Sequence, residues 1–260
     1  MHRTDRSFEP LKPIPARSSL HVESGLFSSP SHDTACALFV PMHYESGYAY
    51  PLVVWLHEEG DDERQLMRMM PLVSMRNYVA VAPRGVRLAL AGGSGRDVYG
   101  WRQTEEIVRQ AEQRIFDSIE QAQRKVHVAA RRIFLAGFGH GGTMAFRVAL
   151  NHPSRFAGVL SFGGAFPHGR NPLGNLIEVR RLPIFLAVGR DSRRYLPETV
   201  CEDLRLFHAA GLSTTLRQYP CGQELSPQML ADMDRWIIEQ ITAPGAAVER
   251  PSRYWSPDPD

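Results

Sequence analysis

Short, continuous apolar runs alternate along this chain with segments of helical periodicity. Uninterrupted apolar strands are typical of a parallel sheet that is covered on both faces. Strand–helix alternation therefore predicts an α/β fold with a mostly parallel central sheet and helices on both faces. The predicted strands are 35–40, 52–57, 78–83, 133–137, 158–162, 184–189 and 215–220, and the predicted helices are 63–75, 104–127, 143–150, 197–210 and 226–241.

The chain of 260 residues is long enough for one large domain, and no internal repeat or second boundary divides it. Residues 1–33 are rich in proline, serine and charge, which predicts a flexible N-terminal arm. Residues 243–260 have a similar composition and predict a flexible C-terminal tail. We expect one α/β domain at 34–242, with little or no cap domain.

Composition excludes several classes of protein. A formal net charge of +2 gives no general attraction for nucleic acid, and no apolar stretch reaches the ~20 residues of a membrane helix. The N-terminus lacks the apolar run of a secretory signal. Cys36, Cys201 and Cys221 are odd in number and far apart, which argues against a disulfide framework and a zinc site. We expect a cytoplasmic protein without nucleic-acid or membrane partners.

A glycine-rich turn joins the predicted strand 133–137 to the next helix. Gly137, Gly139 and Gly142 satisfy the G-x-G-x-x-G spacing of dinucleotide-binding turns. That fold also needs an acidic residue about 20 positions further on, for the ribose hydroxyls. The next acidic residue after Glu120 is Glu178. A dinucleotide-dependent oxidoreductase is therefore kept only as a remote alternative, and no cofactor is predicted.

The same turn has the frame of a nucleophile elbow, G-x-S-x-G, in which a serine lies on a sharp turn between a strand and a helix. Here the central position is Gly139. The chain resembles the phospholipase/carboxylesterase branch of the α/β-hydrolases, which includes acyl-protein thioesterases. Five segments carry the resemblance in the family's order: LHEEGDD (56–62), GFGHGG (137–142), NHPSRFAGVLSFGG (151–164), LPIFLAVGRD (182–191) and LRQYPCGQE (216–224).

The resemblance implies a catalytic triad whose positions are degenerate in this chain. The serine position holds Gly139, and the histidine position holds Gln223. The nearest carboxylate at the acid position is Asp191, which is one residue out of register, so Ser192 remains an alternative occupant. Glycine has no nucleophile, and an amide does not transfer protons near neutral pH. No intact catalytic residue is therefore predicted.

Other residues near the elbow are candidates for lining a ligand pocket: His57, Glu58, Phe138, His140 and Gly141. The resemblance implies an oxyanion-stabilising loop where Glu58 and Glu59 stand, and a carboxylate there would oppose the developing charge. The simpler expectation is that both carboxylates point to solvent. His140 would begin a helix, where the dipole disfavours an imidazolium. We predict no metal site.

These observations predict a non-catalytic member of a hydrolase fold. The free backbone N–H groups at a helix N-terminus favour anions, so a small anionic or acyl ligand is expected, or else a protein partner over the mouth of the site. The alternative is an active carboxylesterase, phospholipase or thioesterase that uses an unrecognised nucleophile. Ester turnover distinguishes the two.

Overall fold

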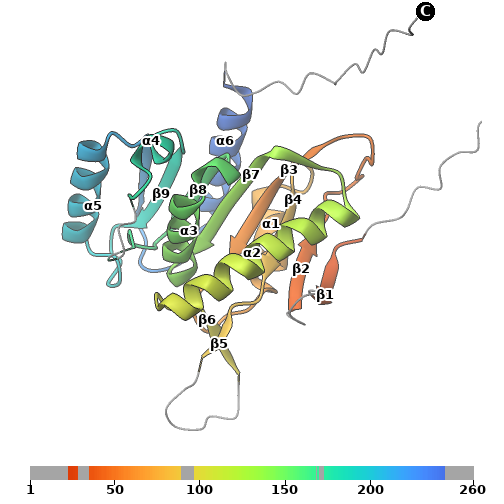
Figure 1. Ribbon diagram of the computed structural model, residues 1–260, viewed down its shortest axis with the longest axis horizontal. Helices are drawn as coiled ribbons and strands as arrows, with labels where there is room; N and C mark the ends of the chain where they lie inside the picture. The colour runs from red at the N-terminus through yellow and green to blue at the C-terminus, as the bar shows by residue number, and fades with distance from the viewer. Residues whose placement is uncertain (1–22, 29–34, 89–96, 168, 170–172, 244–260) are drawn as a thin grey trace, which may run out of the picture.

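The computed structural model describes residues 23–28, 35–88, 97–167, 169 and 173–243 (Figure 1). Its main feature is an eight-stranded sheet in the order β1-β2-β4-β3-β7-β8-β9-β10. The strands of this sheet are β1 (Gly25–Ser28), β2 (Ala35–Phe39), β3 (Tyr50–Leu56), β4 (Val79–Pro83), β7 (Val128–Phe138), β8 (Gly158–Phe162), β9 (Ile184–Gly189) and β10 (Thr214–Tyr219).

The sheet is parallel except at one edge. Strands β4, β3, β7, β8, β9 and β10 pair in parallel, whereas β2 is antiparallel to both β4 and β1. The expectation of a mostly parallel sheet is therefore confirmed. Parallel pairing brings the carboxyl ends of these strands to one edge of the sheet, where ligand sites of open α/β sheets form.

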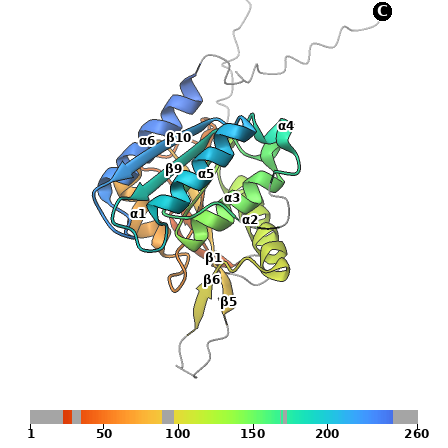
Figure 2. The same cartoon turned by 90° about the vertical axis from the view of Figure 1, so that its left-hand side faces the viewer.

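Helices cover both faces of the sheet, as Figure 2 shows. The alternation of β3 explains why: Leu52, Val54 and Leu56 face one apolar cluster, while Val53 and Trp55 face the other. The first cluster packs under α2 (Glu105–Lys125), α3 (His140–Asn151) and α5 (Pro197–Ala210), and the second under α1 (Gln65–Val73) and α6 (Pro227–Thr242). A 3₁₀ turn, η1 (Pro153–Arg155), follows α3, and the short helix α4 (Leu176–Val179) precedes β9.

Local signals in the sequence explain several helix boundaries. The Thr104 side chain accepts a hydrogen bond from the Ile107 N–H and caps α2, while Ser226 caps α6 through the N–H of Met229. In both cases the capping residue itself occupies the N-cap position, directly before the first residue of the helix. The predicted helix at 143–150 begins three residues earlier, at His140, because the turn at Gly139 leads straight into it.

Three strands were not expected from the sequence. Strand β1 lies within the range predicted as the N-terminal arm, so that prediction is wrong for Gly25–Ser28, which pair with β2. Strands β5 (Val86–Leu88) and β6 (Val98–Gly100) form a separate hairpin that projects beyond the sheet in Figure 1. Most of the predicted N-terminal arm, and the tail apart from Ala243, lie outside the described residues.

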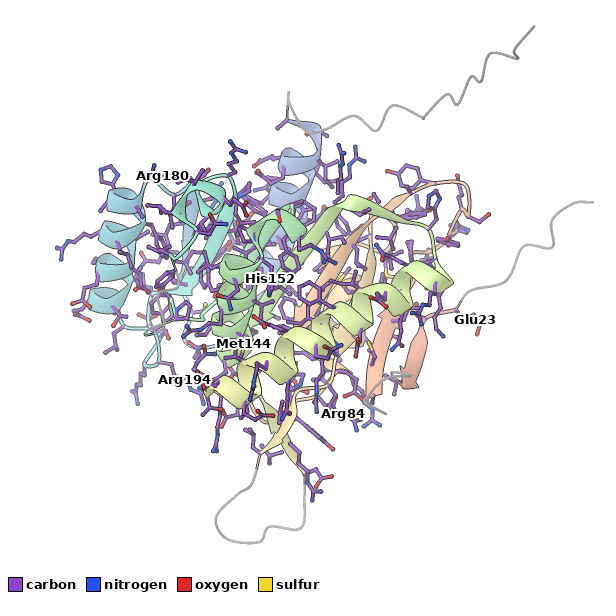
Figure 3. All side chains as sticks on the ribbon, viewed as in Figure 1. Glu23, Arg84, Met144, His152, Arg180 and Arg194 are labelled. Carbon is purple, nitrogen blue, oxygen red and sulfur yellow. The ribbon has the colours of Figure 1, made fainter. Side chains whose placement is uncertain are left out.

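The carboxyl end of the sheet gathers the segments that carry the candidate site. Leu56 at the end of β3 lies opposite Gly137 of β7, and Tyr219 at the end of β10 lies opposite Gly189 of β9. In Figure 3, Arg194, which follows β9, and Arg180, which precedes it, lie at opposite ends of the sheet. No helix among the described residues combines the length and the apolar character needed to cross a bilayer.

Candidate functional site

The turn between β7 and α3 has the geometry of a nucleophile elbow. Gly139 adopts φ 52° and ψ −117°, a conformation that residues with a Cβ rarely take, and His140 begins the helix immediately after it. The Gly139 N–H donates to the Phe162 carbonyl at 2.8 Å. A Cβ on Gly137 would overlap the backbone of Gly141, so the glycines around the turn allow the helix to pack closely on the strand.

The space beside Gly139 is filled by the side chain of Glu58. A Cβ built on Gly139 would overlap the carboxylate of Glu58, which comes from the loop after β3. The carboxylate thus takes the volume in which an elbow serine would place its side chain. The expectation that Glu58 points to solvent is therefore wrong, since only 14% of its side chain is exposed.

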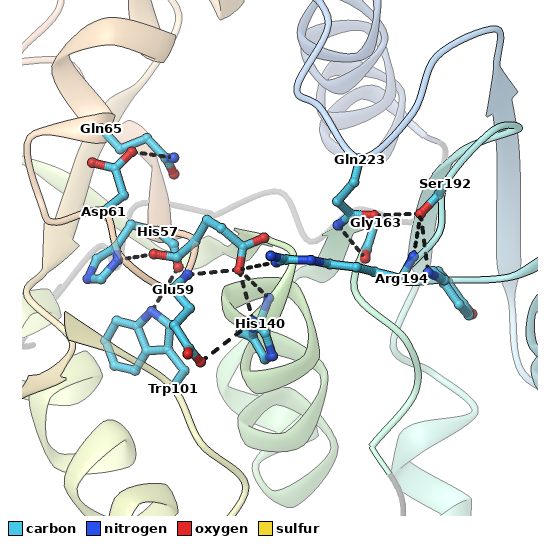
Figure 4. Close-up of polar contacts among 12 residues, drawn as sticks. His57, Glu59, Asp61, Gln65, Trp101, His140, Gly163, Ser192, Arg194 and Gln223 are labelled. Carbon is cyan, nitrogen blue, oxygen red and sulfur yellow. Dashed lines mark hydrogen bonds and ion pairs between the residues drawn. The ribbon is translucent and has the colours of Figure 1, made fainter. Parts of the chain in front are cut away.

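One oxygen of Glu58 receives all the hydrogen bonds that the described residues donate to the carboxylate. Its Oε1 accepts from the backbone N–H of Glu59 at 2.8 Å, and from the backbone N–H and Nδ1–H of His140 at 3.2 and 3.0 Å. The guanidinium of Arg194, in the loop after β9, lies 3.6 Å from the same oxygen. The other oxygen, Oε2, is buried and has no hydrogen-bond partner. Figure 4 shows His140, Glu59 and Arg194 converging here.

The pairing of Glu58 with His140 shifts the pKa of both groups. Burial alone would raise the pKa of the Glu58 carboxyl, but the hydrogen bonds from His140 and Glu59 lower it below its ordinary value. The hydrogen bond to Glu58 raises the pKa of His140, against the opposing effect of burial. The pKa of His140 is thus raised, although its position at the helix N-terminus was expected to disfavour the imidazolium.

The triad-equivalent positions Gln223 and Ser192 contact each other. The Ser192 hydroxyl donates to Oε1 of Gln223 at 2.7 Å, and Nε2 of Gln223 donates to the Gly163 carbonyl at 3.0 Å (Figure 4). Asp191 instead turns outward, with 61% of its side chain exposed and Arg190 as its ion-pair partner. Of the two residues that the sequence left open for the acid position, Ser192 is therefore the one that contacts Gln223.

His57 is a structural residue rather than part of a pocket. It is fully buried, its Nε2 accepts from the Gly85 N–H at 2.9 Å, and its Nδ1 lies 2.8 Å from the Glu58 carbonyl. Because a backbone N–H can only donate, Nδ1 carries the proton and donates to Glu58. Burial lowers the pKa of His57, which keeps the imidazole neutral. The prediction that His57 lines a pocket is therefore wrong.

The remaining predicted pocket residues divide between the site and the core. His140 lies at the mouth, with 46% of its side chain exposed. Gly141 is buried, and a Cβ on it would overlap the carbonyl of Leu56, so it packs against the end of β3 instead of lining a pocket. Phe138 is partly buried and packs against the apolar cluster under α1 and α6. Among the described residues, no group of three or more His, Cys, Asp or Glu side chains is placed to hold a metal ion.

One residue of the site, Arg194, was not predicted from the sequence, and Ser192 was predicted only as an alternative to Asp191. Arg194 reaches Glu58 from a loop 136 positions further along the chain, and the sequence carries no signal for that contact. Ser192 is 4% exposed, and its hydroxyl also accepts from the backbone N–H groups of Arg194 and Tyr195. In turns, a serine hydroxyl often accepts hydrogen bonds from the backbone N–H groups two and three residues ahead. The serine itself was therefore the available signal in the sequence.

Solved structures with the same fold include several esterases. SOBER1 from Arabidopsis thaliana is 19% identical with a TM-score of 0.63, and the match covers 74% of this chain and 100% of that chain. A carboxylesterase from Mesorhizobium loti is 18% identical with a TM-score of 0.66, covering 84% and 99%. The Bacillus cereus carboxylesterase is 16% identical with a TM-score of 0.63, covering 80% and 94%. At these identities the likeness establishes the fold alone.

The family itself is identified by sequence. The profile of the phospholipase/carboxylesterase family matches residues 44–241, which is about three quarters of the chain. The match spans β3 to α6 and includes the elbow, the Glu58 loop, Ser192 and Gln223. The chain therefore belongs to the phospholipase/carboxylesterase family of α/β-hydrolases.

Proposed function

We propose that this protein is a non-catalytic member of its family, with a binding role in place of ester hydrolysis. The observation that carries the proposal is the set of side chains at the three triad positions. Gly139 offers no hydroxyl, Gln223 offers an amide, and Ser192 offers a hydroxyl to that amide in place of a carboxylate. None of the three can perform the step that a serine-triad mechanism assigns to it.

Proton transfer is the first step that this site lacks. A general base needs a lone pair with a pKa near the working pH, and an amide nitrogen has none. Both ends of the Gln223 amide are also engaged, one by Ser192 and the other by the Gly163 carbonyl. Gln223 therefore joins the loop after β9, through Ser192, to the loop after β8, through Gly163, and it exchanges no proton.

Charge stabilisation is the second step that is missing. Acyl transfer develops a negative oxygen that must meet hydrogen-bond donors at the elbow. Here the carboxylate of Glu58 already accepts the His140 N–H, and its charge would repel a second anion. Loss of a triad serine or histidine typically lowers turnover about 10⁶-fold, and the remaining activity depends on that donor site. We therefore expect no measurable ester turnover.

Other nucleophiles near the elbow lack a base. Ser161 is fully buried and its hydroxyl donates to the Gly164 carbonyl at 2.7 Å. Burial is the main cause that raises the pKa of the Cys221 thiol, which disfavours the reactive thiolate. Neither residue has an imidazole as a hydrogen-bond partner in the part of the chain that the structure describes. These environments support the non-catalytic proposal over an unrecognised serine or cysteine nucleophile.

One observation favours a second candidate, a hydrolase that activates water. His140 is held through Nδ1 by the Glu58 carboxylate, which is the arrangement of a general base with its orienting acid. Such a base could deprotonate water directly, without a covalent intermediate. The neighbouring Glu58 charge opposes the same reaction at the acyl oxygen, so we rank this candidate second.

Two assays separate these candidates from a serine hydrolase. We expect the purified protein to resist labelling by a fluorophosphonate probe and to leave p-nitrophenyl acetate and an acyl thioester uncleaved. Turnover without labelling would favour the water-activating site, provided that His140→Gln abolishes it. Labelling would overturn the non-catalytic proposal, and mapping of the labelled peptide would identify the nucleophile.

The binding role rests on the charged mouth of the site. His140 and Arg194 are 46% and 59% exposed around the nearly buried Glu58, so a polar ligand or a protein surface would meet fixed charges there.

A cytoplasmic location is part of the same proposal. It is supported by the three cysteines of the sequence, all of which are free in the structure.

A further inference from the structure

We infer that the elbow is an anion site whose resident ligand is the chain's own Glu58 carboxylate, and that this site accepts a small external carboxylate once Glu58 is removed. The inference rests on the proposed function in one respect: no reaction requires the elbow to be open. It concerns which chemical group the elbow binds, and its test does not measure ester cleavage.

The donors that surround Glu58 form a built site. They are the backbone N–H groups of Glu59 and His140, the imidazole Nδ1–H of His140, and the guanidinium of Arg194 at 3.6 Å. They come from three separate segments: the loop after β3, the first turn of α3 and the loop after β9. Two of the four groups are side chains, one of them the permanently charged guanidinium of Arg194, so the site does not depend on the helix N-terminus alone.

The carboxylate of Glu58 is held in the elbow through only one of its two oxygens. Its Oε1 receives the hydrogen bonds, whereas Oε2 is buried beside Gly139 and has no partner. A tethered side chain cannot rotate freely to engage both oxygens, but a free carboxylate can. An external carboxylate therefore has at least the same donors available, with fewer constraints on its orientation.

The space left by Glu58 suits a small carboxylate. Gly139 has no side chain, and the three atoms nearest to where its Cβ would lie all belong to the Glu58 carboxylate. Replacing Glu58 by alanine would vacate the position of the carboxylate and leave His140 and Arg194 without their shared partner. Formate and acetate match the vacated group in charge and geometry.

Competition explains why the wild-type protein should bind such anions poorly. A group tethered next to its site acts at an effective concentration on the order of millimolar or above, and its own charge adds repulsion. An external carboxylate must displace it. We therefore expect acetate to bind Glu58→Ala at least about tenfold more tightly than the wild-type protein.

The test is a thermal-shift titration of Glu58→Ala with sodium acetate and sodium formate, against sodium chloride at matched ionic strength. The expected result is a saturable rise in Tm with both carboxylates that chloride does not reproduce. Wild-type protein and Glu59→Ala, which keeps the Glu58 carboxylate, serve as controls and should respond to acetate no more than to chloride. Equal responses of Glu58→Ala to acetate and chloride would overturn the inference.

A second variant covers the case in which Glu58→Ala does not fold. Glu58→Gln retains the bulk of the side chain but lacks its charge, so its hold on His140 is weaker. We expect acetate to displace it at lower concentrations than those that affect the wild-type protein, with a change in the ¹H–¹⁵N signal of His140. If Glu58→Gln shows no acetate-dependent change, the inference fails.

The outcome is distinguishable from a failure of the proposed function. Ester turnover is measured on the wild-type protein, whereas anion binding is measured on the Glu58 variants. An active wild-type enzyme would refute the non-catalytic proposal and leave an acetate response intact. An inactive wild-type protein without an acetate response in either variant would refute only the resident-ligand inference.

Discussion

The hydroxyl of Ser192 donates to the side-chain carbonyl of Gln223 at 2.7 Å. Under the proposed mapping, these two positions correspond to the carboxylate and the imidazole of a serine hydrolase, which form a charged pair during catalysis. Here they form a neutral pair that joins the loop after β9 to the loop after β10.

The first prediction concerns the strength of that support. Replacing either Ser192 or Gln223 by alanine removes a hydrogen bond and leaves a partly buried partner unsatisfied, so each variant should lose about 1–3 kcal/mol in the free energy of unfolding. The double variant should lose less than the sum, by about 0.5–1.5 kcal/mol, because the shared bond is counted twice. Urea unfolding of the four proteins measures this coupling. Strict additivity would show that the two side chains act independently.

The second prediction concerns the restoration of catalysis. Gly139→Ser with Gln223→His should remain inactive, because the acid position still holds Ser192 and Glu58 still fills the elbow. Adding Ser192→Asp and Glu58→Gly supplies the acid and clears the space. The fourfold variant should hydrolyse p-nitrophenyl acetate at least about 100-fold faster than the double variant, since a positioned base typically contributes about 10²–10⁴-fold.

Alanine in place of serine at position 139 is the matched control for this series. It keeps the other three changes and removes only the nucleophile, so any turnover that survives in it comes from general solvent or base effects. If the double variant were already as active as the fourfold variant, then Glu58 would not obstruct the elbow and Ser192 would not be the acid position.

The fold could be predicted from the sequence because its signals are local and repeated. Buried parallel strands appear as continuous apolar runs, and all seven predicted strands correspond to strands of the sheet. Strands β1, β5 and β6 have three or four residues, and β5 and β6 carry one buried position each, which is too little for a pattern. Their pairing is decided by neighbouring segments, which a single stretch of sequence does not reveal.

The site could be predicted only in part. The positions of Gly139 and Gln223 follow from motifs next to strand ends, and the structure brings both to the carboxyl edge of the sheet. The direction of Glu58 could not be predicted, because it depends on a contact with His140, 82 positions away. The choice between Asp191 and Ser192 depended on a single-residue register in a loop, which only the three-dimensional path of the chain decides.

The third prediction concerns Gly139. A serine there must adopt a positive φ, which costs on the order of 1–3 kcal/mol, and it must also push the Glu58 carboxylate out of its hydrogen bonds. Together these effects should lower the free energy of unfolding by about 2–4 kcal/mol. In a Glu58→Ala background the second effect is absent, so the same substitution should cost about 1–3 kcal/mol. Denaturant unfolding of the four proteins checks this, and a stabilised Gly139→Ser would contradict it.

The fourth prediction concerns the pH dependence of stability. The pKa of His140 is raised from its ordinary value of 6.5, so its contribution is complete below pH 6.5 and is lost as the pH rises through the folded-state pKa. The pKa of Glu58 is lowered from 4.5, so its contribution is complete above pH 4.5 and is lost as the pH falls through the folded-state pKa. The stabilising effect of the pair should therefore be greatest between pH 4.5 and 6.5.

The measurement is the difference in unfolding free energy between the wild-type protein and Glu58→Gln across pH 4 to 9. Since 46% of the His140 side chain is exposed, solvent screens the pair, and the pH-dependent part of the difference should stay below about 1 kcal/mol. Part of the difference should persist above the folded-state pKa of His140, because Arg194 stays charged and lies 3.6 Å from Glu58. Glu59→Gln is the comparison variant. The Glu59 carboxylate lies 3.8 Å from Nδ1 of His140, farther than the Glu58 carboxylate at 3.0 Å, so its removal should change the pH profile less. A profile that rises with pH above 6.5 would have the wrong sign and would show that Glu58 does not stabilise the protonated imidazole.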